Sequence, residues 1–186
     1  MGTSVISEAP FNLCQDLCHI SPEHDIGSLT LGEAYRLFVK DEQSAIPLQV
    51  WLLENPNSPI ALPGNVDLRG HDCIHLLLNR GMSNFDEAFV VGFTMGNCDA
   101  VKERHISSFK LFSRFFYPAT FRFKEWHLRV FELGLMYGRK LEYRNLHLEN
   151  FDPYFDMKIS VLRQKFGVIT DEIKLIWKTE RIFLKA

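Results

Sequence analysis

The sequence predicts an all-α protein, a single-domain helical bundle of about seven to nine helices. Helix-capping and helix-breaking residues recur along the whole chain of 186 residues, whereas strand-like alternation of apolar and polar residues is hard to find. A chain of this length fits one domain and can bury an apolar core without disulfides. We therefore predict one helical domain over residues 1–186, with an irregular or partly ordered N-terminal segment over residues 1–28.

Capping signals predict where the helices begin. Thr30 and Glu33 have the spacing of a capping box, in which each residue satisfies the other's backbone amide, and Ser83 with Asp86 repeats the pattern. Clusters of Pro, Gly and Asn predict where the helices end. The predicted helices span residues 34–39, 48–53, 68–79, 85–95, 99–116, 123–141, 152–166 and 171–179.

The charge balance excludes an obvious nucleic-acid partner. Lys and Arg number 21 against 23 Asp and Glu, which gives a net charge of −2. Basic residues are nevertheless concentrated between Lys102 and Arg144. This segment contains ten basic and four acidic residues, a local excess of 10 − 4 = +6. Solvated helix faces explain such a distribution as readily as an anion-binding surface does.

The sequence favours a cytoplasmic location. The N-terminus has neither the Arg-rich amphipathic stretch of a transit peptide nor the apolar core of a secretory signal. Apolar runs such as Ala88 to Met95 are far too short to span a bilayer, so we expect membrane contact only from the side, at the inner face. The 16 Phe residues suit a core, a lipid tunnel or a membrane-facing surface.

The cysteines are too sparse for a disulfide scaffold, which indicates a reducing compartment. They are Cys14, Cys18, Cys73 and Cys98. Cys14 and Cys18, with His19 beside them, form only a weak candidate for a soft-metal site, because a zinc knuckle needs a second pair of ligands.

His71, Asp72, His75 and Glu87 are the candidate metal ligands and the candidate catalytic residues, and Asp72 either binds the ion directly or orients one of the histidines. His71 and His75 lie four apart in a predicted helix, which places both rings on one face. Glu87 follows a turn that Asn79 or Gly81 can make, so an antiparallel helix can return it to the histidines. The set suits a divalent ion, zinc first, with iron, manganese or magnesium as alternatives.

Two other metal-dependent enzyme classes share parts of this motif. Metalloproteases have Glu directly after the first His, where this chain has Asp72, so peptide hydrolysis is disfavoured. The phosphohydrolases named for a His-Asp doublet are the alternative. They need a distant His before the doublet and an Asp after it, for which His24, Asp99 and Asp152 are the candidates.

The metal motif resembles that of a known family. His71-Asp72-Cys73-Ile74-His75, followed after eleven residues by Glu87, is similar to the HDxxH-x11-E motif of the coenzyme Q biosynthesis protein four family. The resemblance continues in the Gly-Arg-Lys of residues 138–140 and the Leu-Arg-x-x-x-Gly-Val of residues 162–168. It covers about residues 30–168. Asn79 and Asp86 depart from it, since the family often has Gly at both positions.

This resemblance implies an all-α protein at a membrane surface that binds a long prenyl tail and takes part in ubiquinone-like quinone assembly. Family members act as organisers of a biosynthetic complex or in oxidative decarboxylation of a prenylated aromatic ring. The implied partners are a prenyl lipid or quinone precursor, the membrane and other quinone-biosynthesis proteins. The missing transit peptide predicts a non-mitochondrial member. A non-catalytic lipid-binding protein is the remaining alternative.

The stretch from Phe109 to Tyr117 is compatible with lipid contact. Phe109, Phe112 and Phe116 share one predicted helix face, and Lys110 and Arg114 share another. Such a helix can lie on a bilayer surface, line a lipid tunnel or pack into the core. A homodimer through these aromatic faces is a further expectation, although the sequence specifies no symmetric interface.

Overall fold

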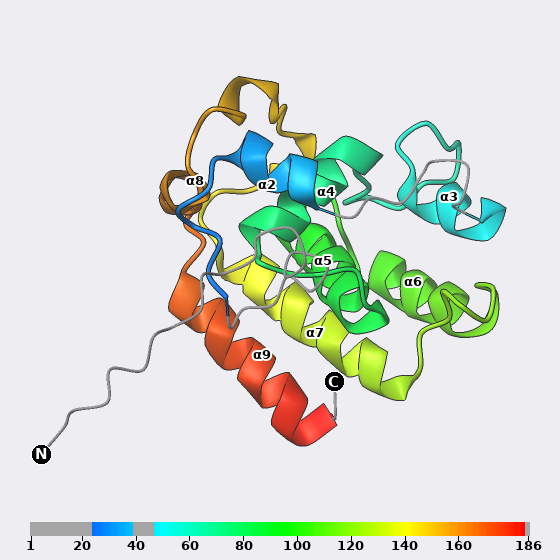
Figure 1. Ribbon diagram of the computed structural model, residues 1–186. Coiled ribbons are helices and arrows are strands. Elements are labelled where there is room, and N and C mark those ends of the chain that lie inside the picture. Colours follow the sequence, from blue (N-terminus) through cyan, green and yellow to red (C-terminus); the bar gives the residue numbers. More distant parts are fainter. Residues whose placement is uncertain (1–23, 39–46, 185–186) are drawn as a thin grey trace, which may run out of the picture.

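The computed structural model describes residues 24–38 and 47–184, and that part of the chain is all-α, as predicted (Figure 1). Its helices are α2 (Leu31–Leu37), α3 (Leu48–Glu54), α4 (Leu68–Leu77), α5 (Asn84–Asn97), α6 (Glu103–Phe115), α7 (Glu125–Lys140), the short 3₁₀ helices η3 (Leu146–Leu148) and η4 (Asp152–Tyr154), α8 (Ile159–Phe166) and α9 (Thr170–Leu184). The eight α-helices of these residues fall within the predicted number. Cys14, Cys18 and His19 lie outside the described residues, as does most of the segment predicted to be irregular.

Both predicted capping boxes are confirmed. The Glu33 amide donates to Thr30 Oγ1 over 3.2 Å, and the Thr30 amide donates to the Glu33 carboxylate over 2.8 Å. At α5, Ser83 and Asp86 exchange the same two bonds. These side chains satisfy amides that have no partner inside the helix, and so they fix where α2 and α5 begin.

Helices α5 and α7 cross at very close range in the centre of the molecule (Figure 1). Each carries two glycines four residues apart, Gly92 and Gly96 on α5 and Gly134 and Gly138 on α7. A methyl group built on Gly92 would lie 2.1 Å from the Phe131 carbonyl oxygen, well inside van der Waals contact. Only glycine therefore permits this backbone approach, which brings the whole inner face of α5 against α7.

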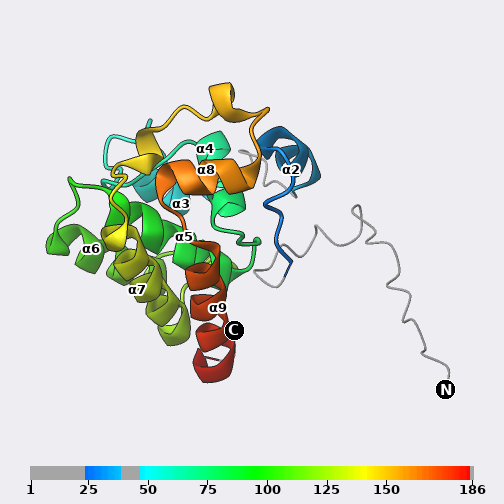
Figure 2. The same cartoon turned by 90° about the vertical axis from the view of Figure 1, so that its left-hand side faces the viewer.

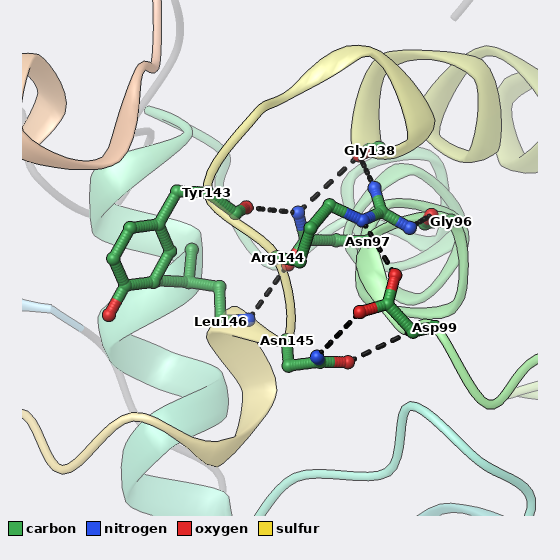
Figure 3. Close-up of polar contacts among 8 residues, drawn as sticks. All are labelled: Gly96, Asn97, Asp99, Gly138, Tyr143, Arg144, Asn145 and Leu146. Carbon is green, nitrogen blue, oxygen red and sulfur yellow. Dashed lines mark hydrogen bonds and ion pairs between the residues drawn. The ribbon is translucent and has the colours of Figure 1, made fainter.

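Polar side chains close the C-terminal ends of these two helices (Figure 3). Arg144 donates to the Gly138 carbonyl over 2.8 Å, to the Gly96 carbonyl over 3.0 Å and to Asp99 over 2.9 Å. The buried Asn97 side chain donates to the Tyr143 carbonyl over 2.7 Å. Helix ends leave carbonyls without intrahelical donors, so these bonds join α5, α7 and the following loop into one unit.

The prediction of one continuous helix over residues 152–166 is wrong at residues 155–158. The backbone there pairs with the start of α2: Leu31 donates to the Met157 carbonyl and Gly32 to the Phe155 carbonyl, over 2.9 and 2.8 Å. An isolated antiparallel bridge joins Thr30 and Lys158. Tertiary hydrogen bonds thus replace the helical ones, and the segment divides into η4 and α8.

The remaining helices pack around the central pair. Figure 2 shows α8 passing across α4, while α9 lies beside α7 in both views. Arg163 of α8 donates to the Leu77 carbonyl over 2.8 Å and so ties α8 to the end of α4. No helix among the described residues combines the length and apolar character that crossing a bilayer would need.

Candidate metal centre and its pocket

Helix α4 holds the two histidines. The Asp67 side chain caps its first turn by accepting from the Gly70 amide over 2.8 Å. At its other end Asn79 has a φ of 52°, and the Arg80 amide donates to the His75 carbonyl over 2.9 Å. This is a Schellman motif, and it shows that Asn79 takes the left-handed position that the sequence offered to Asn79 or Gly81. After this turn, α5 brings the chain back towards the histidines of α4.

Glu87, in the first turns of α5, meets both histidines as predicted. Its carboxylate oxygens lie 3.6 Å from His71 Nε2 and 3.2 Å from His75 Nε2. One ligand atom from each of the three residues falls within 4.8 Å of the other two. Two donors bound at zinc distances in a tetrahedron are about 3.4 Å apart, so this donor set fits a divalent ion.

Burial and the mutual contacts of these three groups shift the pKa of each of them. Burial lowers the pKa of His71 to about 4, against the opposing pull of the Glu87 carboxylate, so His71 is neutral near pH 7. Burial acts the same way on His75, but Glu87 outweighs it and raises the pKa of His75. Burial raises the pKa of Glu87, but the two histidines outweigh burial and lower this pKa to about 2. The Glu87 carboxylate thus acts on the pKa of both histidines in the direction opposite to burial.

Asp72 is buried but stays outside the group of converging atoms. Its carboxylate is a hydrogen-bond partner of Tyr35 on α2, and its charge contributes to raising the pKa of His75. A carboxylate on α4 that is held by Tyr35 of α2 can orient the neighbouring histidines without sharing an ion with Glu87. Metal ligation by Asp72 remains a prediction.

Two of the three converging residues, His71 and Glu87, line a largely apolar pocket, and the third, His75, is fully buried. His71, Asp72 and Glu87 line a cavity of about 150 Å³ between α3, α4, α5 and the loop after α6. Its apolar walls include Val50, Trp51, Leu62, Met82, Val91, Met95, Phe109, Phe121 and Phe123. Apolar walls with a few converging polar groups are typical of small-molecule sites, and a cavity of this volume accommodates a benzene-sized ring.

The candidate ligands of the phosphohydrolase alternative do not lie together with the histidines of α4 among the described residues. Asp99 is held by Arg144 and Asn145 at the far end of α5, and Asp152 pairs with Arg69 at the surface over 2.7 Å. His24 is not among the groups that converge on the histidines. None of the three candidate residues therefore completes the ligand set of that family among the described residues.

Sequence reasoning missed two titratable residues of the pocket, Glu54 and Tyr117, which line it from α3 and from the loop after α6. The Tyr117 hydroxyl donates to Glu54 Oε1 over 2.5 Å. Their separation of 63 residues leaves no spacing pattern to read. The one local signal was Glu54 itself, an acidic residue at the C-terminal end of a helix, where negative charge is unfavourable.

No protein-family model, curated protein or solved structure matches this chain in comparisons with known proteins. The resemblance to the coenzyme Q biosynthesis protein four family therefore remains a prediction carried by motif spacing alone.

Proposed function

We propose that this chain holds a divalent metal ion, zinc first, through His71, His75 and Glu87, and acts on a prenylated aromatic ring in prenyl-quinone assembly. The observation that carries the proposal is the convergence of three ligand atoms at the edge of a ring-sized apolar pocket. Three protein ligands leave coordination positions open, as in working rather than structural zinc sites. The role in quinone assembly is proposed because the spacing of the motif resembles that of the coenzyme Q biosynthesis protein four family.

Each residue of the site has a distinct task in this proposal. A bound ion supplies Lewis acidity to an oxygen substituent of the ring. His71 and His75 bind it from α4, and Glu87 binds it from α5 and balances its charge. Asp72 orients the histidine face of α4 through Tyr35. The apolar walls exclude water and hold the ring in one orientation.

We further propose that α6 meets the membrane from which a prenyl lipid enters. Phe115 and Phe116 are 58% and 57% exposed, and Leu111 and Phe112 beside them are also exposed. Phe109 of the same predicted helix face is fully buried, so it packs into the core, which is one of the placements expected from the sequence. Exposed aromatic rings within a region of basic excess suit an anionic lipid surface.

Metal analysis of the purified protein tests the site. We expect one ion per chain, by elemental mass spectrometry, in the unchanged protein and in His105→Ala, which removes an imidazole from α6, away from the pocket. We expect His75→Ala and Glu87→Gln to lose the ion. Equal, stoichiometric metal in Glu87→Gln and the unchanged protein, with both folded by circular dichroism, would show that the site is wrongly assigned.

A non-catalytic organiser that binds lipid is the alternative function, and turnover separates it from an enzyme. Incubation of the metal-loaded protein with a prenylated hydroxybenzoate should release carbon dioxide if the chain is a decarboxylase. Binding of the prenyl lipid without release, in native mass spectrometry of the same sample, would favour the organiser.

A further inference from the structure

Glu54 and Tyr117 form a second polar site in the pocket, apart from the three converging residues. The Tyr117 ring is only 2% exposed and packs edge-on against Phe109, so its hydroxyl is held in place. That hydroxyl donates to one carboxylate oxygen of Glu54, Oε1, over 2.5 Å. Among the described residues, no hydrogen bond reaches the other oxygen, Oε2. One oxygen is therefore fixed, and the other is left for whatever occupies the cavity.

A purely structural role for the hydrogen bond from Tyr117 does not explain why residue 54 is Glu. Glu54 ends α3, where the helix macrodipole is negative and a carboxylate is unfavourable. Two apolar residues, or a Gln, could join α3 to the loop without a charge in the pocket. Residues that break a local rule in this way are concentrated at functional sites.

The surroundings of Glu54 place it between its two protonation states near neutral pH. Burial raises its pKa to about 7, against the stabilising hydrogen bond of Tyr117 and with a smaller contribution from the Glu87 charge. The other titratable groups lining the cavity are His71 and Asp72 on α4. Burial raises the pKa of Tyr117 far above its usual range, so Tyr117 keeps its proton.

We propose that Glu54 is the acid–base residue of this pocket, exchanging a proton through Oε2 with a hydroxyl or keto oxygen of a bound aromatic ring. As the O–H bond of the ring hydroxyl breaks, an O–H bond forms on Oε2, and the reverse step returns the proton. Only a proton is transferred between the ring oxygen and Glu54, so no oxidant is required. Tyr117 positions Glu54 by holding Oε1. The class of substrate rests on the proposed function, whereas the proton exchange does not require the metal.

The probe for this proposal is 4-nitrophenol, because only its phenolate form absorbs visible light and its spectrum therefore reports proton position. The measurement is the pKa of the bound probe in chelator-treated protein. Nuclear magnetic resonance of the Trp51 indole, which lines the cavity, shows that the probe is inside. The variants are Glu54→Gln, which keeps the size and the Tyr117 contact, and Glu132→Gln, a matched change at a partly exposed position on α7.

We expect the ionised Glu54 to oppose formation of the phenolate, so the bound probe should have a pKa higher by about one unit or more in the unchanged protein than in Glu54→Gln. Glu132→Gln should match the unchanged protein. In Tyr117→Phe, which frees Oε1 and raises the pKa of Glu54, the effect should begin at higher pH. An equal probe pKa with and without Glu54, or no response of Trp51, would overturn the proposal. Metal analysis is unaffected by either outcome, so the two proposals fail separately.

Discussion

At the scale of single residues, Arg80 and Glu180 show how α9 is attached to the rest of the protein. Their side chains are 0% and 1% exposed and share two hydrogen bonds, of 2.6 and 2.9 Å. The guanidinium also lies over the Phe89 ring, 3.8 Å from its centre. Burial raises the pKa of Glu180 despite the opposing pull of Arg80, so the pair itself adds little net stability.

Breaking this pair should nevertheless be costly, because the buried Arg80 would keep only a longer ion pair, over 3.8 Å, with Asp86. We expect Glu180→Ala to lower the free energy of unfolding by about 3–5 kcal/mol, measured by urea denaturation. Glu132→Ala, which removes an exposed partner of Lys110, should cost about 1 kcal/mol or less. Similar losses in the two variants would mean that α9 is not held by this ion pair.

A second residue-scale prediction concerns acid stability. Burial raises the pKa of Asp25, but the hydrogen bond and charge of Arg163 outweigh it and lower the value below 3.8. A lowered folded-state pKa stabilises the protein above the unfolded-state value, and this stabilisation is lost as pH falls through the folded-state value. Because the Asp25 side chain is 44% exposed, we expect Asp25→Asn to cost about 0.5–1 kcal/mol at pH 7.

The measurement is the difference in unfolding free energy between Asp25→Asn and the unchanged protein between pH 7 and pH 2. It should be constant at neutral pH and shrink below pH 4. A difference that persists unchanged at pH 2 would contradict the ion-pair account.

At the scale of elements, the crossing of α5 and α7 depends on its glycines. A methyl group on Gly134 would lie 2.1 Å from the Phe89 carbonyl oxygen, and backbone cannot rotate away as a side chain can. We expect Gly134→Ala to lower the free energy of unfolding by about 1–3 kcal/mol, although Ala favours helices over Gly by about 1 kcal/mol. Gly70→Ala on α4 is the comparison and should cost less, because its nearest neighbour, 2.8 Å away, is a methyl group of the Val66 side chain and not backbone. Stabilisation by Gly134→Ala would disprove the close crossing.

These elements also show what the sequence could and could not predict. Capping boxes and the His-His-Glu spacing are local patterns, so Thr30, Ser83 and the convergence of His71, His75 and Glu87 were predictable. The break at residues 155–158 comes from hydrogen bonds to α2, which lies more than a hundred residues earlier and leaves no local trace. The glycine pairs of α5 and α7 were visible as a spacing of four, but their meaning required knowing that the two helices are partners. Glu54 and Tyr117 likewise meet only in three dimensions.

The aromatic face of α6 gives another prediction at this scale. Each Phe moved from water into lipid contributes about 1.5–3 kcal/mol, so Phe115→Ser with Phe116→Ser should weaken binding to anionic vesicles at least about tenfold. Co-sedimentation with phosphatidylglycerol vesicles measures this. Ile182→Ser with Phe183→Ser, at similarly exposed positions on α9, is the control and should bind as the unchanged protein does. Equal losses from both faces would remove α6 as the membrane contact.

At the scale of the whole molecule, a bound ion should stabilise the fold, since its ligands come from two helices that separate on unfolding. An ion at one hundred times its dissociation constant adds about 2.7 kcal/mol, which for a domain of this size raises the melting temperature by about 5–10 °C. We expect Zn²⁺ to do this in the unchanged protein and in His105→Ala, and a chelator to reverse it. Glu87→Gln should melt at the same temperature with and without Zn²⁺. An equal increase in Glu87→Gln would place the ion elsewhere, and His71, His75 and Glu87 would then be no more than an ion pair between α4 and α5.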